Sequence, residues 1–130
     1  MGNVEVATQA IDAFNGGNVG AFAALTTPDF EWSPSMVAIE NKIFRGRTGI
    51  ENYFGTLHNA WERFHILSDG FRVLGDDCVV MLGRLEGRGK GSGVPVDSPL
   101  GMVFDFRDGA ISRIRGYLDH AEALEAAEGS

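Results

Sequence analysis

The feature that most constrains the fold of this chain is a change in the spacing of its apolar residues near residue 65. Before that point apolar residues recur every three or four positions, as in Val4, Ala7, Ile11 and Phe14, which is typical of amphipathic helices. After it, runs rich in β-branched and aromatic residues are separated by turns that contain glycine and aspartate. The chain therefore combines a helical first half with a second half of successive strands.

Capping and breaking residues bound the elements expected in the first half. Helices are predicted at 4–14, 19–25 and 49–64, with a short strand at 30–32. Asn18 and Thr48 are the expected N-caps of the second and third helices. Residues 33–47 contain Pro34 and have mixed polarity, so we expect a loop there.

The second half is expected to form a meander of four strands and a last helix. The strands are predicted at 65–75, 76–89, 96–109 and 110–119, and the helix at 120–128. Asp108-Gly109 between two apolar runs is a strong signal for a tight hairpin. Helices early in the sequence and a meander late in it predict an α+β fold, a curved antiparallel sheet with helices packed on one face. Such a sheet leaves a cavity under the helices, and residues 1–130 are expected to form one domain.

Composition excludes several classes of partner. Eighteen acidic residues against eleven basic ones give a net charge of -7, which repels phosphate backbones, so we expect no nucleic acid partner. The apolar runs are too short to cross a bilayer, and no secretory signal is visible. The single cysteine, Cys78, rules out an internal disulfide and fits the cytoplasm. The three histidines lack metal-ligand spacing, so no metal or other cofactor is expected.

Three charged residues of the last strands form a candidate catalytic group. Arg84 and Glu86 lie two apart, so they share a face of their strand, and Asp119 ends the final strand. If neighbouring strands bring Arg84 between the two carboxylates, one carboxylate can accept a proton while the other donates one. The alternative is an ordinary ion pair on a solvated sheet face.

Two long segments resemble a known family. The order of elements, the stretch FRGRTGIENYF at 44–54 and the tail at 106–128 resemble SnoaL-like proteins of the nuclear-transport-factor-like superfamily. This resemblance implies a cone-shaped sheet with the helices on its concave face, and homodimers. Within the superfamily, GRLE at 83–86 and YLD at 117–119 look like the segments that supply the catalytic row of limonene-epoxide hydrolases. The resemblance to SnoaL-type cyclases implies that Asp119 acts as an acid-base group.

The expected function is cofactor-independent acid-base catalysis on a small apolar molecule, similar to epoxide hydrolases or polyketide cyclases. Asp119, Arg84 and Glu86 are the predicted catalytic residues. The side chains predicted to contact the substrate are Trp32, Tyr53, His58, Trp61 and Tyr117. The alternative is a module of the same fold that binds an apolar ligand or dimerises without turnover, because Trp32 and Pro34 stand where the epoxide hydrolases hold water. The outer sheet face, with alternating apolar residues such as Met102 and Phe104, is a candidate for the dimer contact, but the sequence leaves open which face holds Met102, because one bulge reverses the parity.

Overall fold

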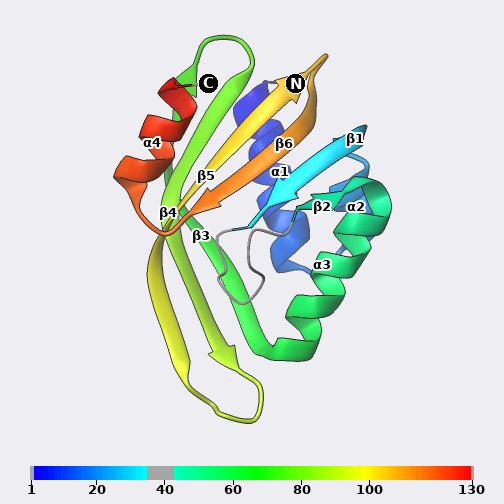
Figure 1. Cartoon of the computed structure of the whole chain (residues 1–130), viewed down its shortest axis with the longest axis vertical. Coiled ribbons are helices and arrows are strands. Elements are labelled where there is room, and N and C mark those ends of the chain that lie inside the picture. The colour runs from blue at the N-terminus through cyan, green and yellow to red at the C-terminus, as the bar shows by residue number, and fades with distance from the viewer. Residues whose placement is uncertain (1, 35–42, 130) are drawn as a thin grey trace.

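Six strands form one curved, open sheet in the computed structural model, which describes residues 2–34 and 43–129 (Figure 1). The helices are α1 (Asn3–Asn15), α2 (Val19–Ala23), α3 (Gly46–Ala60) and α4 (His120–Glu128). The strands are β1 (Thr26–Ser33), β2 (Phe44–Arg45), β3 (Trp61–Leu74), β4 (Cys78–Gly89), β5 (Pro95–Arg107) and β6 (Ala110–Tyr117). The predicted α+β class is confirmed.

The strands lie in the order β2-β1-β6-β5-β4-β3. From β3 to β6 they form the expected antiparallel meander, whereas β1 runs parallel to β6. The turn between β5 and β6 is confirmed as a tight hairpin, since Asp108 and Gly109 both have positive φ, 53° and 82°. The sheet thus joins an early strand to the last one.

The sheet has two differently covered faces. Met81 and Leu85 of β4 point into the large core under α1, α2 and α3, and Val80 and Leu82 point the other way because side chains alternate along a strand. Helix α4 packs on this second face instead of joining the other helices (Figure 1). A Cβ atom at Gly101 would lie 2.4 Å from the Cβ of Ala123, so glycine permits this close approach.

The ends of the elements differ from expectation mainly at the third helix. The Asn18 cap is confirmed, since its side chain accepts a hydrogen bond from the Ala21 N–H at 3.0 Å. Helix α3, however, begins at Gly46 rather than after Thr48, and the backbone at Trp61 is already extended. The prediction that this helix continues to Phe64 is therefore wrong. Trp61 and Phe64 belong instead to β3, which follows α3 without a loop.

Met102 and Phe104, the candidate residues for a dimer contact, do not lie on the outer face of the sheet. Met102 and Phe104 are buried in the core beneath the helices and are 5% and 0% exposed. Their alternation along β5 was read correctly, but the sequence does not show which face of the strand the helices cover. Most of the predicted loop at 33–47 lies outside the described residues, which resume at Ile43.

Candidate functional site

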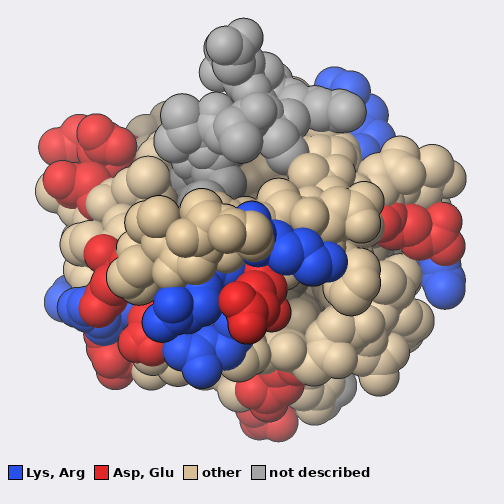
Figure 2. Space-filling view, turned by 90° about the horizontal axis from the view of Figure 1, so that it is seen from below, with Lys and Arg blue, Asp and Glu red and all other residues tan. Residues whose placement is uncertain are grey.

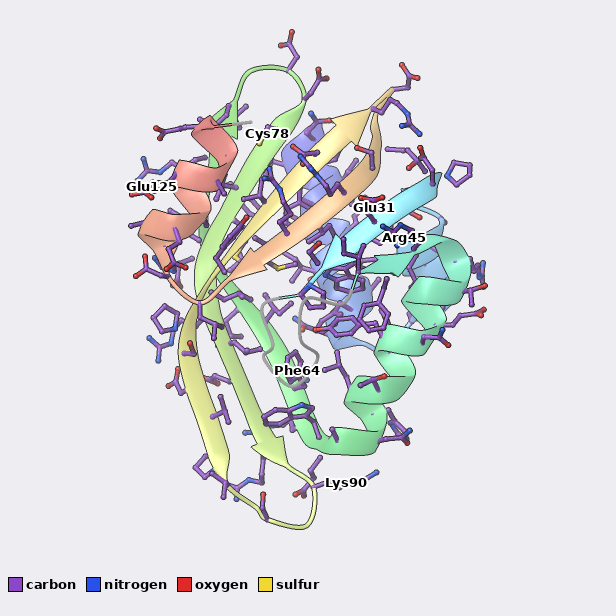
Figure 3. The ribbon with its side chains drawn as sticks, viewed as in Figure 1. Glu31, Arg45, Phe64, Cys78, Lys90 and Glu125 are labelled. Carbon is purple, nitrogen blue, oxygen red and sulfur yellow. The ribbon has the colours of Figure 1, made fainter. Side chains whose placement is uncertain are left out.

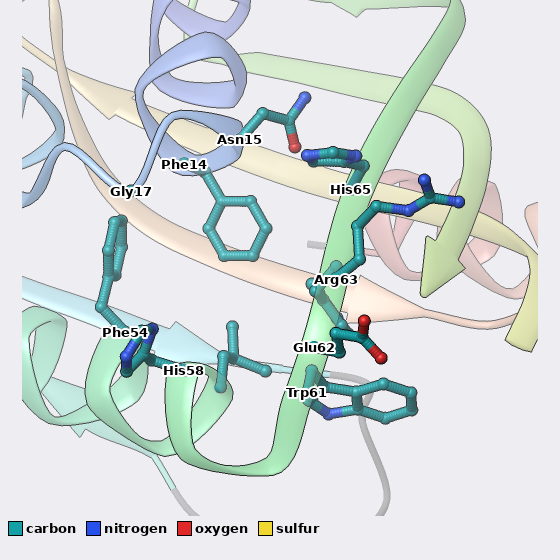
Figure 4. A pocket seen from close by; sticks show the side chains of 11 residues that line it. Phe14, Asn15, Gly17, Phe54, His58, Trp61, Glu62, Arg63 and His65 are labelled. Atoms are coloured by element: carbon teal, nitrogen blue, oxygen red, sulfur yellow. The ribbon is translucent and has the colours of Figure 1, made fainter. Parts of the chain in front are cut away.

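A cavity of about 230 Å³ lies where the end of α1, the second half of α3 and the start of β3 meet (Figure 4). We call it the outer pocket. Its position follows from the abrupt passage of α3 into β3, which places side chains of both elements around one space. The lining residues are Phe14, Asn15, Gly17, Phe54, Leu57, His58, Trp61, Glu62, Arg63, Phe64 and His65.

Aromatic rings form much of the wall of the outer pocket. The ring of Phe14 lies edge-on to Phe54 and to Phe64, with centroid distances of 5.5 and 5.8 Å. Trp61 lies 5.4 Å from Phe64. Such edge-to-face pairs are favourable arrangements of aromatic side chains, so they hold the wall in shape while leaving an apolar surface.

Polar groups surround this apolar wall. His58, Glu62 and Arg63 are exposed, and His65 is half-buried. The amide of Asn15 is already engaged, because its nitrogen donates to the Ile66 carbonyl and its oxygen accepts from the Ile66 N–H, both at 2.8 Å. A bound molecule could therefore place its apolar part against the rings and meet an imidazole or a charged group with its polar part.

A second cavity of about 20 Å³, the inner cavity, lies deeper under the helices. Its walls are mostly apolar, and they consist of Phe14, Trp32, Pro34, Tyr53, Phe64, Ile66, Leu85, Leu100, Met102 and Gly116. Trp32 packs edge-on to Tyr53 at 4.5 Å and stacks on Phe22 at 4.8 Å. Burial raises the pKa of Tyr53 above its ordinary value, so its hydroxyl stays protonated at physiological pH.

The residues predicted to contact substrate are divided between the two faces of the sheet. Trp32 and Tyr53 line the inner cavity, and His58 and Trp61 line the outer pocket. Tyr117 instead packs against the small cluster under α4, on the opposite face of the sheet. The structure therefore brings four of these five residues to the cavities, in two separate groups.

The predicted catalytic residues lie away from both cavities. Arg84 and Glu86 share the face of Val80, and the Arg84 guanidinium pairs with Asp97. The carboxylate of Asp119 is the N-cap of α4 and accepts a hydrogen bond from the Glu122 N–H at 3.1 Å. No hydrogen bond among the described residues joins Arg84 to Glu86 or Asp119. Their catalytic role stays a prediction.

Sequence reasoning did not assign Phe14, Phe64 or Asn15 to a site. It treated Phe14 as core and Asn15 as the end of a helix. The sequence did contain a signal that Phe14 could belong to a site. Asn15-Gly16-Gly17 ends α1 immediately after Phe14 and leaves that ring at the end of the helical layer. His65 lies on β3, as expected from the strand predicted at 65–75.

The remaining surface shows no sign of a large charged interface in the view of Figure 2, where Lys and Arg lie beside Asp and Glu. Elsewhere in the structure, Asp105 Oδ2 accepts a hydrogen bond from Arg113 at 2.8 Å and one from Arg115 at 3.4 Å. Across the described residues, no three His, Cys, Asp or Glu side chains are placed to hold a metal ion. None of the helices in that part of the chain is long and apolar enough to span a membrane.

Solved structures of similar fold cover nearly the whole chain. An NTF2-like protein of unknown function from Burkholderia pseudomallei is 16% identical, with a TM-score of 0.80 and 95% of each chain covered. A candidate SnoaL-like polyketide cyclase from Jannaschia sp. is 22% identical, with a TM-score of 0.77 and coverage of 98% of this chain and 92% of that chain. TerC, co-crystallised with polyporic acid, is 19% identical, with a TM-score of 0.79 and coverage of 97% and 98%.

At these identities the likeness shows the fold alone. No curated protein sequence matches the chain significantly. The family model of the SnoaL-like domain matches residues 7–114, which include most of α1, the strands from β1 to β5 and most of β6. The chain therefore belongs to the SnoaL-like domain family.

Proposed function

We propose that this protein binds a small, mostly apolar molecule in the outer pocket. The observation that carries the proposal is the 230 Å³ cavity with its wall of aromatic rings. An apolar cavity of about 150 Å³ accommodates benzene. By that measure the outer pocket has room for one ring with substituents, and its polar border favours a ligand with a hydroxyl or carbonyl group.

Acid-base turnover in the same pocket is a second candidate function. Two imidazoles, those of His58 and His65, line the outer pocket, and histidine is the side chain that most often serves as a general acid or base. The family, and the polyketide-cyclase assignment of the Jannaschia protein, support a cyclase-like reaction. A ligand with an acidic hydrogen beside a carbonyl would be the suitable substrate class.

Binding can be tested by titrating the isotopically labelled protein with phenol and mapping the amide shifts. We expect saturable shifts around Phe14, Phe54 and Phe64, and weaker binding in Phe54→Ala. Arg84→Ala is the matched control, because Arg84 is exposed on the opposite face. Shifts confined to the α4 face, or weaker binding only in the control, would refute the proposal.

Catalysis by Asp119, Arg84 and Glu86 is the competing proposal, which the family resemblance motivates. It requires turnover to disappear in Asp119→Asn, and oxygen from labelled water in a diol product would identify epoxide hydration. The histidine proposal instead requires loss of turnover in His58→Gln or His65→Gln with Asp119→Asn unaffected. If every bound ligand is recovered unchanged, both catalytic proposals fail and only the binding function is supported.

A homodimer is a further proposal from the same resemblance, and the single cysteine supports the cytoplasm as its location. With Met102 and Phe104 buried under the helices, any contact between copies must use other residues. Sedimentation velocity at micromolar concentration tests the dimer directly. A single species of about the 14.0 kDa chain mass would contradict it.

A further inference from the structure

Two side chains, Phe14 and Phe64, line both the outer pocket and the inner cavity and so separate them. Their rings meet edge to face, with centroids 5.8 Å apart. We propose that the side chain of Phe64 is a movable partition between the two spaces. A ligand longer than one ring displaces this side chain and then occupies both spaces at once. This inference rests on the ligand-binding function proposed above and adds the length of ligand that the site accepts.

Phe64 is the mobile member of the pair because Phe14 is held on more sides. The ring of Phe14 also packs against Trp32, Tyr53 and Phe54, and this residue is buried in the core. Phe64 is half-buried, and within the described part of the chain its ring pairs with those of Phe14 and Trp61. It lies on β3, the edge strand, on the side toward α3 (Figure 3). Among the described residues, turning it toward the solvent therefore breaks fewer ring contacts than turning Phe14 would.

The backbone on either side of Phe64 allows this movement. Two residues later, Ile66 is fixed by its two hydrogen bonds to the Asn15 amide. Before it, the pairing of β3 with β4 shifts register between Trp61 and Arg63. A rotation of the Phe64 side chain can thus occur beside an irregular stretch of strand, while the sheet beyond Ile66 keeps its pairing.

The inner cavity offers a suitable surface once the ring of Phe64 leaves. At about 20 Å³ the cavity itself has room for little more than one water molecule. Leu85, Leu100 and Met102 make its wall apolar, and the flexible methionine can adjust to a guest. Gly116, the strand partner of Met102 on β6, adds no side chain to the same wall. We therefore expect fused two-ring or similarly elongated apolar molecules to extend from the outer pocket toward Trp32.

The two tryptophans of the chain report separately on the two spaces, because Trp61 lines the outer pocket and Trp32 the inner cavity. Incorporation of 5-fluorotryptophan gives one fluorine resonance for each, assigned with Trp61→Phe and Trp32→Phe. We expect phenol to shift the Trp61 resonance chiefly, and 2-naphthol to shift both resonances with one dissociation constant. A 2-naphthol shift at Trp61 alone would overturn the partition and leave the outer-pocket function intact.

The absence of any saturable shift with either compound would overturn the outer-pocket function and the partition with it.

A blocking variant tests the partition independently of spectral assignment. Leu100→Phe places extra volume in the inner cavity, so we expect it to weaken 2-naphthol binding about tenfold and to leave phenol binding nearly unchanged. An equal effect on both ligands would contradict the proposal.

An opening variant should have the opposite effect. Phe64→Ala removes the partition and is expected to tighten 2-naphthol relative to phenol, with Phe64→Leu as the substitute if the alanine variant does not fold. Phe71→Ala is the matched control, because Phe71 also lies half-buried on β3 but lines neither cavity. A similar gain in the control would show that loosening the core, and not the partition, admits the larger ligand.

Discussion

At the scale of single residues, Asn15 has the most specific structural role. Its amide bonds both backbone groups of Ile66, as a neighbouring strand would do, on β3, which is the last strand in the sheet order of the described residues. The side chain thereby joins the end of α1 to the strand that carries Phe64 and His65. Loss of these bonds would leave part-buried backbone groups without a partner.

We expect Asn15→Ala to lower the free energy of unfolding by about 1 to 3 kcal/mol, because both hydrogen bonds to Ile66 are lost. Urea unfolding measures the change, and faster hydrogen exchange at the Ile66 amide localises it. Asn59→Ala, at an exposed position of α3, is the control. Equal stability of the two variants would contradict the role of the Asn15 bridge.

The carboxyl group of Asp29 has a lowered pKa, which makes the stability of the fold depend on pH. The hydrogen bond from Arg107 and then that from Thr27 lower the pKa of its carboxyl from 3.8 to about 2. The folded pKa is below the unfolded one, so the pair stabilises the fold above pH 3.8, and the contribution is lost as the pH falls from 3.8 toward about 2.

A carboxyl-carbon NMR titration can check this shift. We expect Arg107→Ala to raise the pKa of Asp29 toward 3.8, though not fully, because the Thr27 hydroxyl still donates at 2.8 Å. Arg72→Ala, an exposed change elsewhere on the sheet, should leave the titration unchanged. An unmoved Asp29 titration in Arg107→Ala would mean that the ion pair is not populated in solution.

At the scale of elements, α4 depends on its cap. The carboxylate of Asp119 bonds the Glu122 N–H, so Asp119→Ala should destabilise the protein by about 0.5 to 2 kcal/mol, as measured by urea unfolding. Asp119→Asn should preserve stability, because asparagine caps helices equally well. Equal losses in both variants would indicate that the negative charge, and not the cap, is what matters.

The ends of the elements show what the sequence could and could not predict. Asn18 and Asp108-Gly109 were predicted correctly because capping and tight turns depend on neighbouring residues alone. The end of α3 was not, since Ile50, Phe54, Leu57 and Trp61 keep a helical spacing that continues past the true end at Ala60. There the pairing of Trp61 with Gly89 on β4 prevails over the local pattern.

At the scale of the whole molecule, the sheet separates the cavities from α4. We expect Gly101→Val to displace α4 and cost about 1 to 3 kcal/mol, because even a Cβ atom there clashes with Ala123. The affinity for phenol should nevertheless stay within about twofold of wild type, equivalent to a few tenths of a kcal/mol. Calorimetric titration of the folded variant measures the affinity, and a large loss would show that the two faces are coupled.

The same separation explains why the candidate site was only partly predictable. Strand alternation correctly placed Arg84, Glu86 and Val80 on one face, but alternation gives two faces without saying which one the helices cover. The outer pocket was predicted only through His58 and Trp61, because its rings come from α1, α3 and β3, and only tertiary packing brings them together.

The parallel pairing of β1 with β6 also bears on how the chain is made. Residues near Trp32 find their sheet neighbours near Ile114, so the intervening chain must be synthesised before this pair can close. Phe30 and Trp32, both buried in the finished protein, lack that neighbouring strand on the ribosome until β6 has emerged. Such long-range contacts slow folding and prolong the exposure of apolar surface. Strand β6, the last strand to be synthesised, therefore completes the sheet that covers the core under the first helices.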